Sequence, residues 1–310
     1  MNATPAGTAP TPSASDWLLV VLLGMLWGAS FMAVSVALTG YGPLTVAAVR
    51  IALGAAALLA VARASAHRLP DPRQADGRRA WAFAIALGLF SNALPFFFLG
   101  WSQQYVTSGF AGITMAAVPL FVLGLAHVFV PGERLTRWRV AGFLLGLAGV
   151  AMLIGPGVLS STGAAMEGPA RLVCVSAALC YAIGSIVTRR APAVPLISFS
   201  AAALLAAAAM IVPVALAIEG LPAPAGGAGS IALLYLGIGP TALATLILVR
   251  VIRSAGPSFL SQVNYHVPVW SVIFGVALLN ETLPPQFLAA LALILAGLGL
   301  GRARAWRRRP

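Results

Sequence analysis

Long apolar stretches alternate with short polar connections along almost the whole chain. Ten of these stretches are each close to twenty residues, the length of an α-helix that crosses the hydrocarbon core of a bilayer. The predicted helices cover residues 17–39, 43–63, 80–101, 106–130, 137–156, 170–189, 195–218, 230–250, 257–279 and 284–301. The pattern therefore predicts an all-α, polytopic membrane protein with ten transmembrane helices.

The composition favours the same class. Of the 310 residues, 60% are hydrophobic and 8% are charged, whereas about 25% of the residues in a soluble domain are charged. Residues 1–16 are rich in Ala, Thr, Pro and Ser and contain no basic residue. A secretory signal begins with a basic segment, so we expect residues 1–16 to form a disordered tail and the first apolar stretch to remain as a helix.

All 19 basic residues are arginines, and 17 of them follow an even-numbered predicted helix. These are Arg63, Arg68, Arg73, Arg78, Arg79, Arg134, Arg137, Arg139, Arg189, Arg190, Arg250, Arg253, Arg302, Arg304, Arg307, Arg308 and Arg309. Because cytoplasmic loops are enriched in Lys and Arg, we expect both termini in the cytoplasm. Membrane orientation then accounts for the net charge of +12, and we expect no nucleic-acid partner.

The second half of the chain repeats features of the first half at an offset of about 149 residues. The matches are Gly88 with Gly237, Asn92-Ala-Leu with Thr241-Ala-Leu, Phe110 with Phe259, Pro119 with Pro268, Glu133 with Glu281, Leu147-Ala-Gly with Leu295-Ala-Gly, and Pro43-Leu with Pro195-Leu. Each repeat has five helices, so the second repeat enters the membrane from the opposite side. Inverted repeats of this kind build many secondary transporters, whose substrates bind near the bilayer midplane.

The predicted organisation therefore has four parts. A cytoplasmic tail covers residues 1–16, the first five-helix repeat covers 17–156, the second covers 170–301, and a basic cytoplasmic tail covers 302–310. By this symmetry, Glu133 is expected at the cytoplasmic edge of the membrane and Glu281 at the outer edge.

Several motifs resemble those of the drug/metabolite transporter superfamily, which has two EamA-type five-helix repeats. The motifs are Trp27-Gly-x-Ser-Phe31, Pro43 with Arg50, Pro119 followed by Gly132-Glu133, and Pro268 followed by Glu281. The second half departs from the pattern, with Tyr181-Ala in place of Trp27-Gly and Asn280 in place of Gly132. The resemblance spans about residues 17–301.

This resemblance implies a carrier in the inner membrane, often a bacterial exporter of amino acids or related metabolites. It also implies alternating access around a central site lined by the first, third, fourth, sixth, eighth and ninth helices. The implied partners are a small-molecule substrate and membrane lipid. The chain is either a monomer or a homodimer, since the close-packing motif Gly142-x-x-x-Gly146 serves contacts inside a chain or between chains.

Polar side chains inside a membrane usually face the protein interior or a wet cavity. The densest polar group lies in the ninth predicted helix before Pro268, where four members have the spacing of one helical face. This group either lines a substrate cavity, which we favour, or bonds to neighbouring helices. The candidate substrate-binding residues are Trp27, Phe31, Asn92, Trp101, Thr114, Tyr181, Ser258, Ser261, Gln262, Tyr265 and His266.

Two aromatic candidates have alternative roles. Trp27 and Phe31 lie one turn apart in the first helix and either stack on a flat substrate or fill the core. Trp101 is either a gate or an anchor at the membrane interface.

Arg50 lies seven residues into the second predicted helix, about 10 Å from its start at 1.5 Å per residue. Three roles are open for it: holding a substrate carboxylate, pairing with Glu281, or binding backbone carbonyls. We favour a structural pairing, because a buried arginine needs a partner whether or not substrate is bound. The residues expected to have structural or gating roles are Arg50, Pro119, Glu133, Pro268 and Glu281.

Other functional classes fit the sequence less well. A membrane enzyme requires a constellation of acids, His or Cys, but the chain has only seven acidic residues and neither an HExxH nor a GxSxG motif. A channel usually has a ring of charge or a filter loop, and a non-transport scaffold is the remaining alternative. Cys174 and Cys180 share one apolar stretch, which is typical of packing. We therefore expect no enzymatic activity, no cofactor and no metal.

Overall fold

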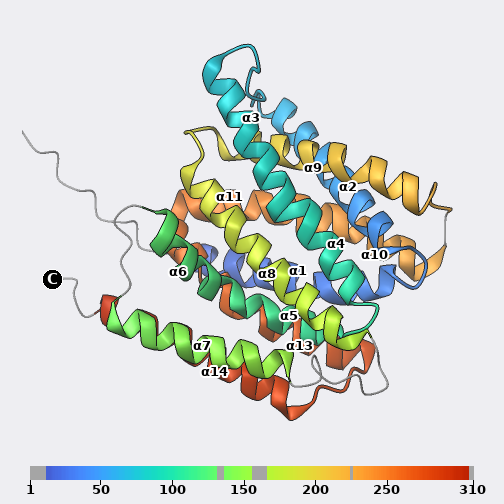
Figure 1. Ribbon diagram of the computed structural model, residues 1–310. Helices are drawn as coiled ribbons and strands as arrows, with labels where there is room; N and C mark the ends of the chain where they lie inside the picture. Colours follow the sequence, from blue (N-terminus) through green and yellow to red (C-terminus); the bar gives the residue numbers. More distant parts are fainter. Residues whose placement is uncertain (1–11, 131–135, 156–165, 224–225, 307–310) are drawn as a thin grey trace, which may run out of the picture.

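The structure is a computed structural model that describes residues 12–130, 136–155, 166–223 and 226–306 (Figure 1). Within these ranges the chain forms helices and no strands. The helices of the first half are α1 (Ala14–Ala37), α2 (Pro43–Ala64), α3 (Ala75–Gly88), η1 (Leu89–Ala93), α4 (Leu94–Ser102), α5 (Ser108–Thr114), η2 (Met115–Ala117), α6 (Val118–Phe129) and α7 (Arg137–Ile154). Those of the second half are α8 (Glu167–Arg190), α9 (Leu196–Ile218), α10 (Gly227–Gly237), η4 (Ile238–Leu243), α11 (Ala244–Ala255), α12 (Pro257–Leu260), α13 (Val263–Leu279) and α14 (Pro285–Trp306).

Among the described residues, eight helical segments are long and apolar enough to cross a membrane, and the shorter apolar helices Val263–Leu279 and Pro285–Leu300 add two more. The prediction of an all-α, polytopic membrane protein is confirmed. Glu133 and the extreme tails lie outside the described residues, so the expected position of Glu133 stays a prediction.

Capping side chains explain where several of the helices begin. The Ser13 and Asp16 side chains form a capping box that starts α1, and the Thr107 and Thr136 hydroxyls each accept one backbone N–H bond at the start of α5 and α7. Such caps give hydrogen-bond partners to the first backbone N–H groups of a helix.

Four of the predicted helices contain an irregular segment. A π-helical turn, η1, separates α3 from α4, and a second π-helical turn, η4, separates α10 from α11. The 3-10 turn η2 interrupts the fourth predicted helix. In the ninth, α12 ends at Leu260, and α13 begins at Val263 after a turn at 261–262. The expected single helix over 257–279 was therefore wrong, and its polar residues do not follow one regular helical face.

The two repeats interlock through symmetry-related contacts. Helix α1 packs against α13, and its counterpart α8 packs against α6, while α2 packs against α9 and α7 against α14. Figure 1 shows α7 and α14 side by side along the lower edge of the bundle. A Cβ on Gly297 would lie 2.4 Å from the carbonyl oxygen of Gly142, so the Gly142-x-x-x-Gly146 motif packs inside the chain.

Two glutamates join the repeats at the end of the bundle where α2 and α5 begin, which we call the Glu219/Glu281 end. The Glu219 carboxylate accepts hydrogen bonds from the backbone N–H groups of Leu44 and Thr45, at 2.9 and 2.8 Å. The Glu281 carboxylate accepts them from Ser108 and Gly109, at 2.7 and 2.9 Å. Free N–H groups and the helix dipole make a helix N-terminus a favourable place for an anion.

Glycines provide the space for both carboxylates. A Cβ on Gly42 would lie 2.4 Å from the carboxyl group of Glu219, and a Cβ on Gly275 would lie 2.4 Å from Oε2 of Glu281. Glu281 is thus held at the start of α5 and does not pair with Arg50, so the favoured ion pair between these two residues was wrong.

We predict that Glu281→Gln lowers the free energy of unfolding by about 1–3 kcal/mol, because an amide NH₂ would face one of the two backbone N–H donors. Unfolding of the purified protein in mixed micelles measures this loss. The matched control is Glu167→Gln, since the Glu167 side chain is 43% exposed in its ion pair with Arg171 and such a pair contributes about 0–1 kcal/mol. Equal losses in the two variants would contradict the structural role of Glu281.

Candidate functional site

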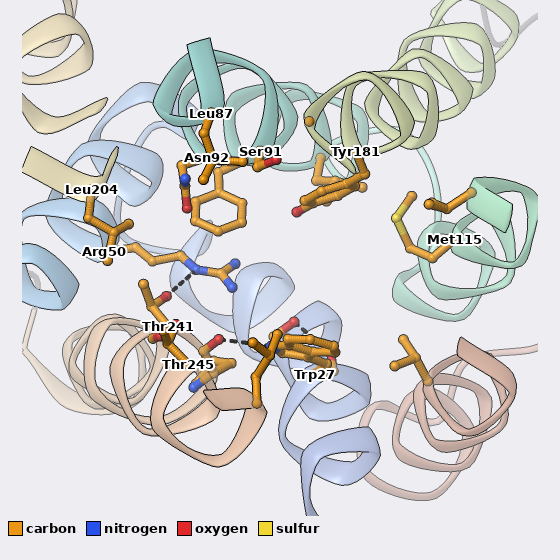
Figure 2. Close-up of a pocket in the computed structure, with 18 of the residues that line it drawn as sticks. Trp27, Arg50, Leu87, Ser91, Asn92, Met115, Tyr181, Leu204, Thr241 and Thr245 are labelled. Atoms are coloured by element: carbon orange, nitrogen blue, oxygen red, sulfur yellow. Dashed lines mark hydrogen bonds between the residues drawn. The ribbon is translucent and has the colours of Figure 1, made fainter. Parts of the chain in front are cut away.

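A cavity of about 380 Å³ lies in the middle of the bundle. Its walls come from α1, α2, the α3–η1–α4 segment, η2 and α6 in the first repeat, and from α8, α9, η4–α11 and α13 in the second. Figure 2 shows the side chains that converge on it. The volume falls in the range of about 300–1,000 Å³ that is usual for small-molecule sites.

Most of the residues that line the cavity come in pairs that the internal repeat relates. The pairs are Trp27 with Tyr181, Ser30 with Gly184, Phe31 with Ser185, Val34 with Thr188, Ser91 with Pro240, Asn92 with Thr241, Phe96 with Thr245, Leu99 with Leu248, Met115 with Asn264, and Val118 with Val267. Pairs from α1 and α8 share one offset in the sequence, and the other pairs share a second offset. The cavity therefore lies where the two repeats meet.

The two members of a pair often differ in chemistry. The first repeat contributes Phe31 and Phe96, whereas the second contributes Ser185 and Thr245 at the equivalent positions. Helices α1 and α4 end at the Glu219/Glu281 end, while α8 and α11 end at the opposite one. At these two pairs, the first repeat places an aromatic ring on the cavity wall where the second places a hydroxyl group.

The π-helical turn η4 is stabilised by side-chain donors. Pro240 has no N–H group and cannot bond to the carbonyl of Leu236, four residues earlier, and the Thr241 hydroxyl donates to that carbonyl at 2.8 Å. The Thr245 hydroxyl donates to the Thr241 carbonyl at 2.6 Å, and the indole Nε1 of Trp27 donates to the Pro240 carbonyl at 3.1 Å. Trp27 thus ties the first repeat to irregular backbone of the second.

Arg50 extends from α2 into the cavity (Figure 2). Its Nε donates a hydrogen bond to the Thr241 hydroxyl at 2.9 Å, and its guanidinium carbon lies 3.7 Å from the ring centroid of Phe96. Gly54 permits this approach, since a Cβ there would lie 2.4 Å from Cγ2 of Thr241. The residue is only 5% exposed, so a fixed positive charge sits inside the bundle.

Four of the predicted substrate-binding residues line the cavity: Trp27, Phe31, Asn92 and Tyr181. The residues that the structure describes but does not place in the cavity wall are Trp101, Thr114, Ser261, Gln262, Tyr265 and His266. The side chain of Ser258 lies outside the described residues.

Three of the residues that lie away from the cavity have clear local roles. The Thr114 hydroxyl is fully buried and donates to the Phe110 carbonyl at 2.9 Å. Nδ1 of His266 lies 3.0 Å from the Gln262 carbonyl oxygen, and a Cβ on Gly24 of α1 would lie 2.6 Å from the His266 Cβ. His266 therefore packs between α1 and α13, and Trp101 lies at the end of α4 with its ring 5.3 Å from that of Tyr105.

Pro119 and Pro268 both lie within helices next to the cavity wall, at the second position of α6 and inside α13. Each is one residue beyond a lining valine, Val118 or Val267. Their expected structural role remains a prediction.

Sequence reasoning missed several residues that line the cavity. They are Ser185, Thr188, Thr241 and Thr245. Ser91, Gln103 and Asn264, which the sequence places in the same polar groups as the candidates, line it as well. The internal repeat contained a signal for two of the missed residues, because Thr241 is the counterpart of the predicted Asn92 and Ser185 is the counterpart of the predicted Phe31.

The EamA-like transporter family matches residues 16–155 and residues 169–300. The chain therefore belongs to the EamA-like transporter family. It is a polytopic membrane transporter with a duplicated five-helix repeat, and it is not an enzyme.

Several known proteins are similar over most of their length. The "uncharacterized inner membrane transporter YedA" of Escherichia coli (strain K12) is 28% identical over 280 residues, covering 88% of this chain and 86% of the relative. A "probable terminal-alkyne amino-acid exporter" of Streptantibioticus cattleyicolor is 28% identical over 310 residues, covering 96% of each chain. A solved crystal structure matches with a TM-score of 0.66 and 26% identity, covering 96% of this chain and 100% of its own.

We predict that a cysteine facing the cavity reacts with a small maleimide at least about tenfold faster than one facing lipid, because thiolate formation needs water. Ser185→Cys and Ser176→Cys, made after Cys174 and Cys180 are changed to Ala, test this on one helix. Each serine hydroxyl donates to the carbonyl four residues earlier, at 2.9 Å, but only Ser185 lines the cavity. Equal labelling rates would indicate a cavity without water.

Proposed function

We propose that the protein exports a small organic metabolite, an amino acid or a related compound, across the cytoplasmic membrane by alternating access. The observation that carries the proposal is the central cavity, whose wall is built from pairs of residues that the inverted repeat relates. In transporters of this architecture, rocking of one repeat against the other moves the opening from one side of a fixed site to the other.

Two observations support an amino acid or a related compound as substrate. The cavity combines aromatic walls with a few polar groups, as small-molecule sites do, and Arg50 supplies one positive charge. The relative from Streptantibioticus cattleyicolor is named a probable amino-acid exporter, which favours both this class of substrate and the outward direction.

The proposed orientation follows from the arginines. Arginines lie in the described segment 65–74 and in the last turns of α8 and α11. These three segments all lie at the end of the bundle opposite the Glu219/Glu281 end. Positive charge is retained on the cytoplasmic side, so both termini are cytoplasmic and the Glu219/Glu281 end faces outward. Protease digestion of tags on each terminus in intact spheroplasts should leave both tags uncut, and cleavage of only one tag would contradict the orientation.

We predict saturable counterflow in proteoliposomes. Vesicles loaded with an unlabelled mixture of amino acids should accumulate the radiolabelled mixture transiently, because a carrier exchanges bound substrate across the membrane. Ser185→Trp should abolish this uptake by filling the cavity, whereas the matched Ser176→Trp, on the outer surface of the same helix, should not. Uptake that rises in proportion to concentration, or an ohmic current, would instead indicate a channel.

A further inference from the structure

We propose that the cavity selects its substrate by one carboxylate group, bound by Arg50, and that an amino group on the substrate is dispensable. This inference rests on the proposed transport function and narrows it to monocarboxylates, which include amino acids together with their 2-hydroxy and 2-oxo analogues.

The first step concerns the hydrogen-bonding capacity of Arg50. A guanidinium group carries five N–H donors in a planar fork, and the bond from Nε to Thr241 uses one of them. The two Nη groups make no hydrogen bond to a described residue, and they point into the cavity between Tyr181 and Trp27 (Figure 2). The two Nη groups, which can bind both oxygens of a carboxylate at once, therefore face the part of the cavity that a ligand would fill.

The second step concerns charge. None of the described residues that line the cavity is an aspartate or a glutamate. The carboxylates of Glu219 and Glu281 are bound to the N-terminal N–H groups of α2 and α5, and that of Asp16, at the start of α1, accepts hydrogen bonds from Ser13 and Ser254. A cation that is only 5% exposed is costly without a counter-charge, so an anionic ligand would be stabilised there.

The third step distinguishes a carboxylate from a phosphate. A phosphate monoester carries a charge of about −1.5 to −2 at neutral pH, whereas the described residues of the lining include one arginine and no other basic residue. A carboxylate matches the single charge of Arg50, and its two oxygens match the planar fork. The surrounding contacts hold the guanidinium in place, because Phe96 covers one of its faces and Thr241 fixes Nε.

The rest of the cavity does not offer an ionic partner for an ammonium group. It offers amide and hydroxyl oxygens from Asn92, Asn264 and Ser91, and aromatic surfaces from Trp27 and Tyr181. Neutral acceptors of this kind can hold either an ammonium or a hydroxyl group. The site therefore requires the carboxylate and tolerates changes at the neighbouring carbon.

The experiment compares matched ligands on the purified protein. Alanine, leucine and phenylalanine are each tested as the amino acid, the 2-hydroxy acid, the 2-oxo acid, the amino amide and the decarboxylated amine, by thermal stabilisation and by inhibition of counterflow. In at least one of the three series we expect all three acids to bind, and the amide and amine to bind at least about tenfold more weakly, as expected when a charged hydrogen bond is lost.

Variants assign the effect to Arg50. Arg50→Gln should reduce acid binding at least about tenfold and remove the preference for acid over amide, and Arg50→Lys should retain part of it because the charge stays but the fork is lost. The control is Arg171→Gln, which removes an arginine that is 13% exposed and bound to Glu167 and the Ile154 carbonyl, outside the cavity wall. This control should keep the acid preference.

Several outcomes would overturn the proposal. They are an amide or amine that binds as well as its acid, an acid preference that survives in folded Arg50→Gln, a phosphate ester such as isopentyl phosphate that binds better than any acid, and failure of all three series to bind. In each case, saturable counterflow of another compound would leave the transport function standing. Absence of any counterflow would count against the transport function itself.

Discussion

The hydrocarbon core of a membrane offers no hydrogen-bond partner to a peptide group, so each backbone N–H and C=O must find one within the protein. This constraint explains where the helices of this transporter are regular and where they are not. The irregular segments η1, η2, η4 and the turn between α12 and α13 all adjoin the central cavity. There, side chains such as Thr241 and Trp27 can bond to the carbonyls that the irregular backbone leaves open.

The internal repeat gives the cavity a symmetric framework with asymmetric chemistry. Equivalent positions of the two repeats line the same cavity, but their side chains differ. Phe31 and Phe96 of the first repeat correspond to Ser185 and Thr245 of the second. Arg50 has no basic counterpart in α9, where the equivalent position holds Ala202. The duplicated helices thus form the cavity, and the differences between equivalent side chains make its wall chemically asymmetric, as a site for an asymmetric substrate must be.

The sequence was sufficient for the number of helices, the repeat and the family, because hydrophobic length and a constant offset between the halves survive without side-chain detail. The sequence did not predict which groups Arg50 and Glu281 contact in the folded protein. Depth in the membrane suggested that these residues pair, but a carboxylate that accepts two N–H bonds at the start of α5 is already satisfied. That arrangement depends on the close approach of α13 to α5, which Gly275 permits and which no local pattern reveals.

The ninth predicted helix shows a second limit of sequence patterns. Counting polar residues located a group in α12 and α13, but helical spacing assigns a common face only if the helix is continuous. At the turn at 261–262 the backbone stays right-handed, but Gln262 and Tyr265 bond to the carbonyl three residues earlier instead of four. Asn264 lines the cavity, whereas His266, two residues further on, packs against Gly24 of α1.

The two π-helical turns also bear on the history of the chain. A π-helical turn corresponds to an α-helix that has gained one residue, and η1 and η4 occupy equivalent places in the two repeats, around Asn92 and Thr241. Two independent insertions at matching positions are a less economical explanation than one insertion inherited by both copies. The extra residue is thus a shared feature of the two five-helix units, and it places one widened helical turn beside the cavity in each half.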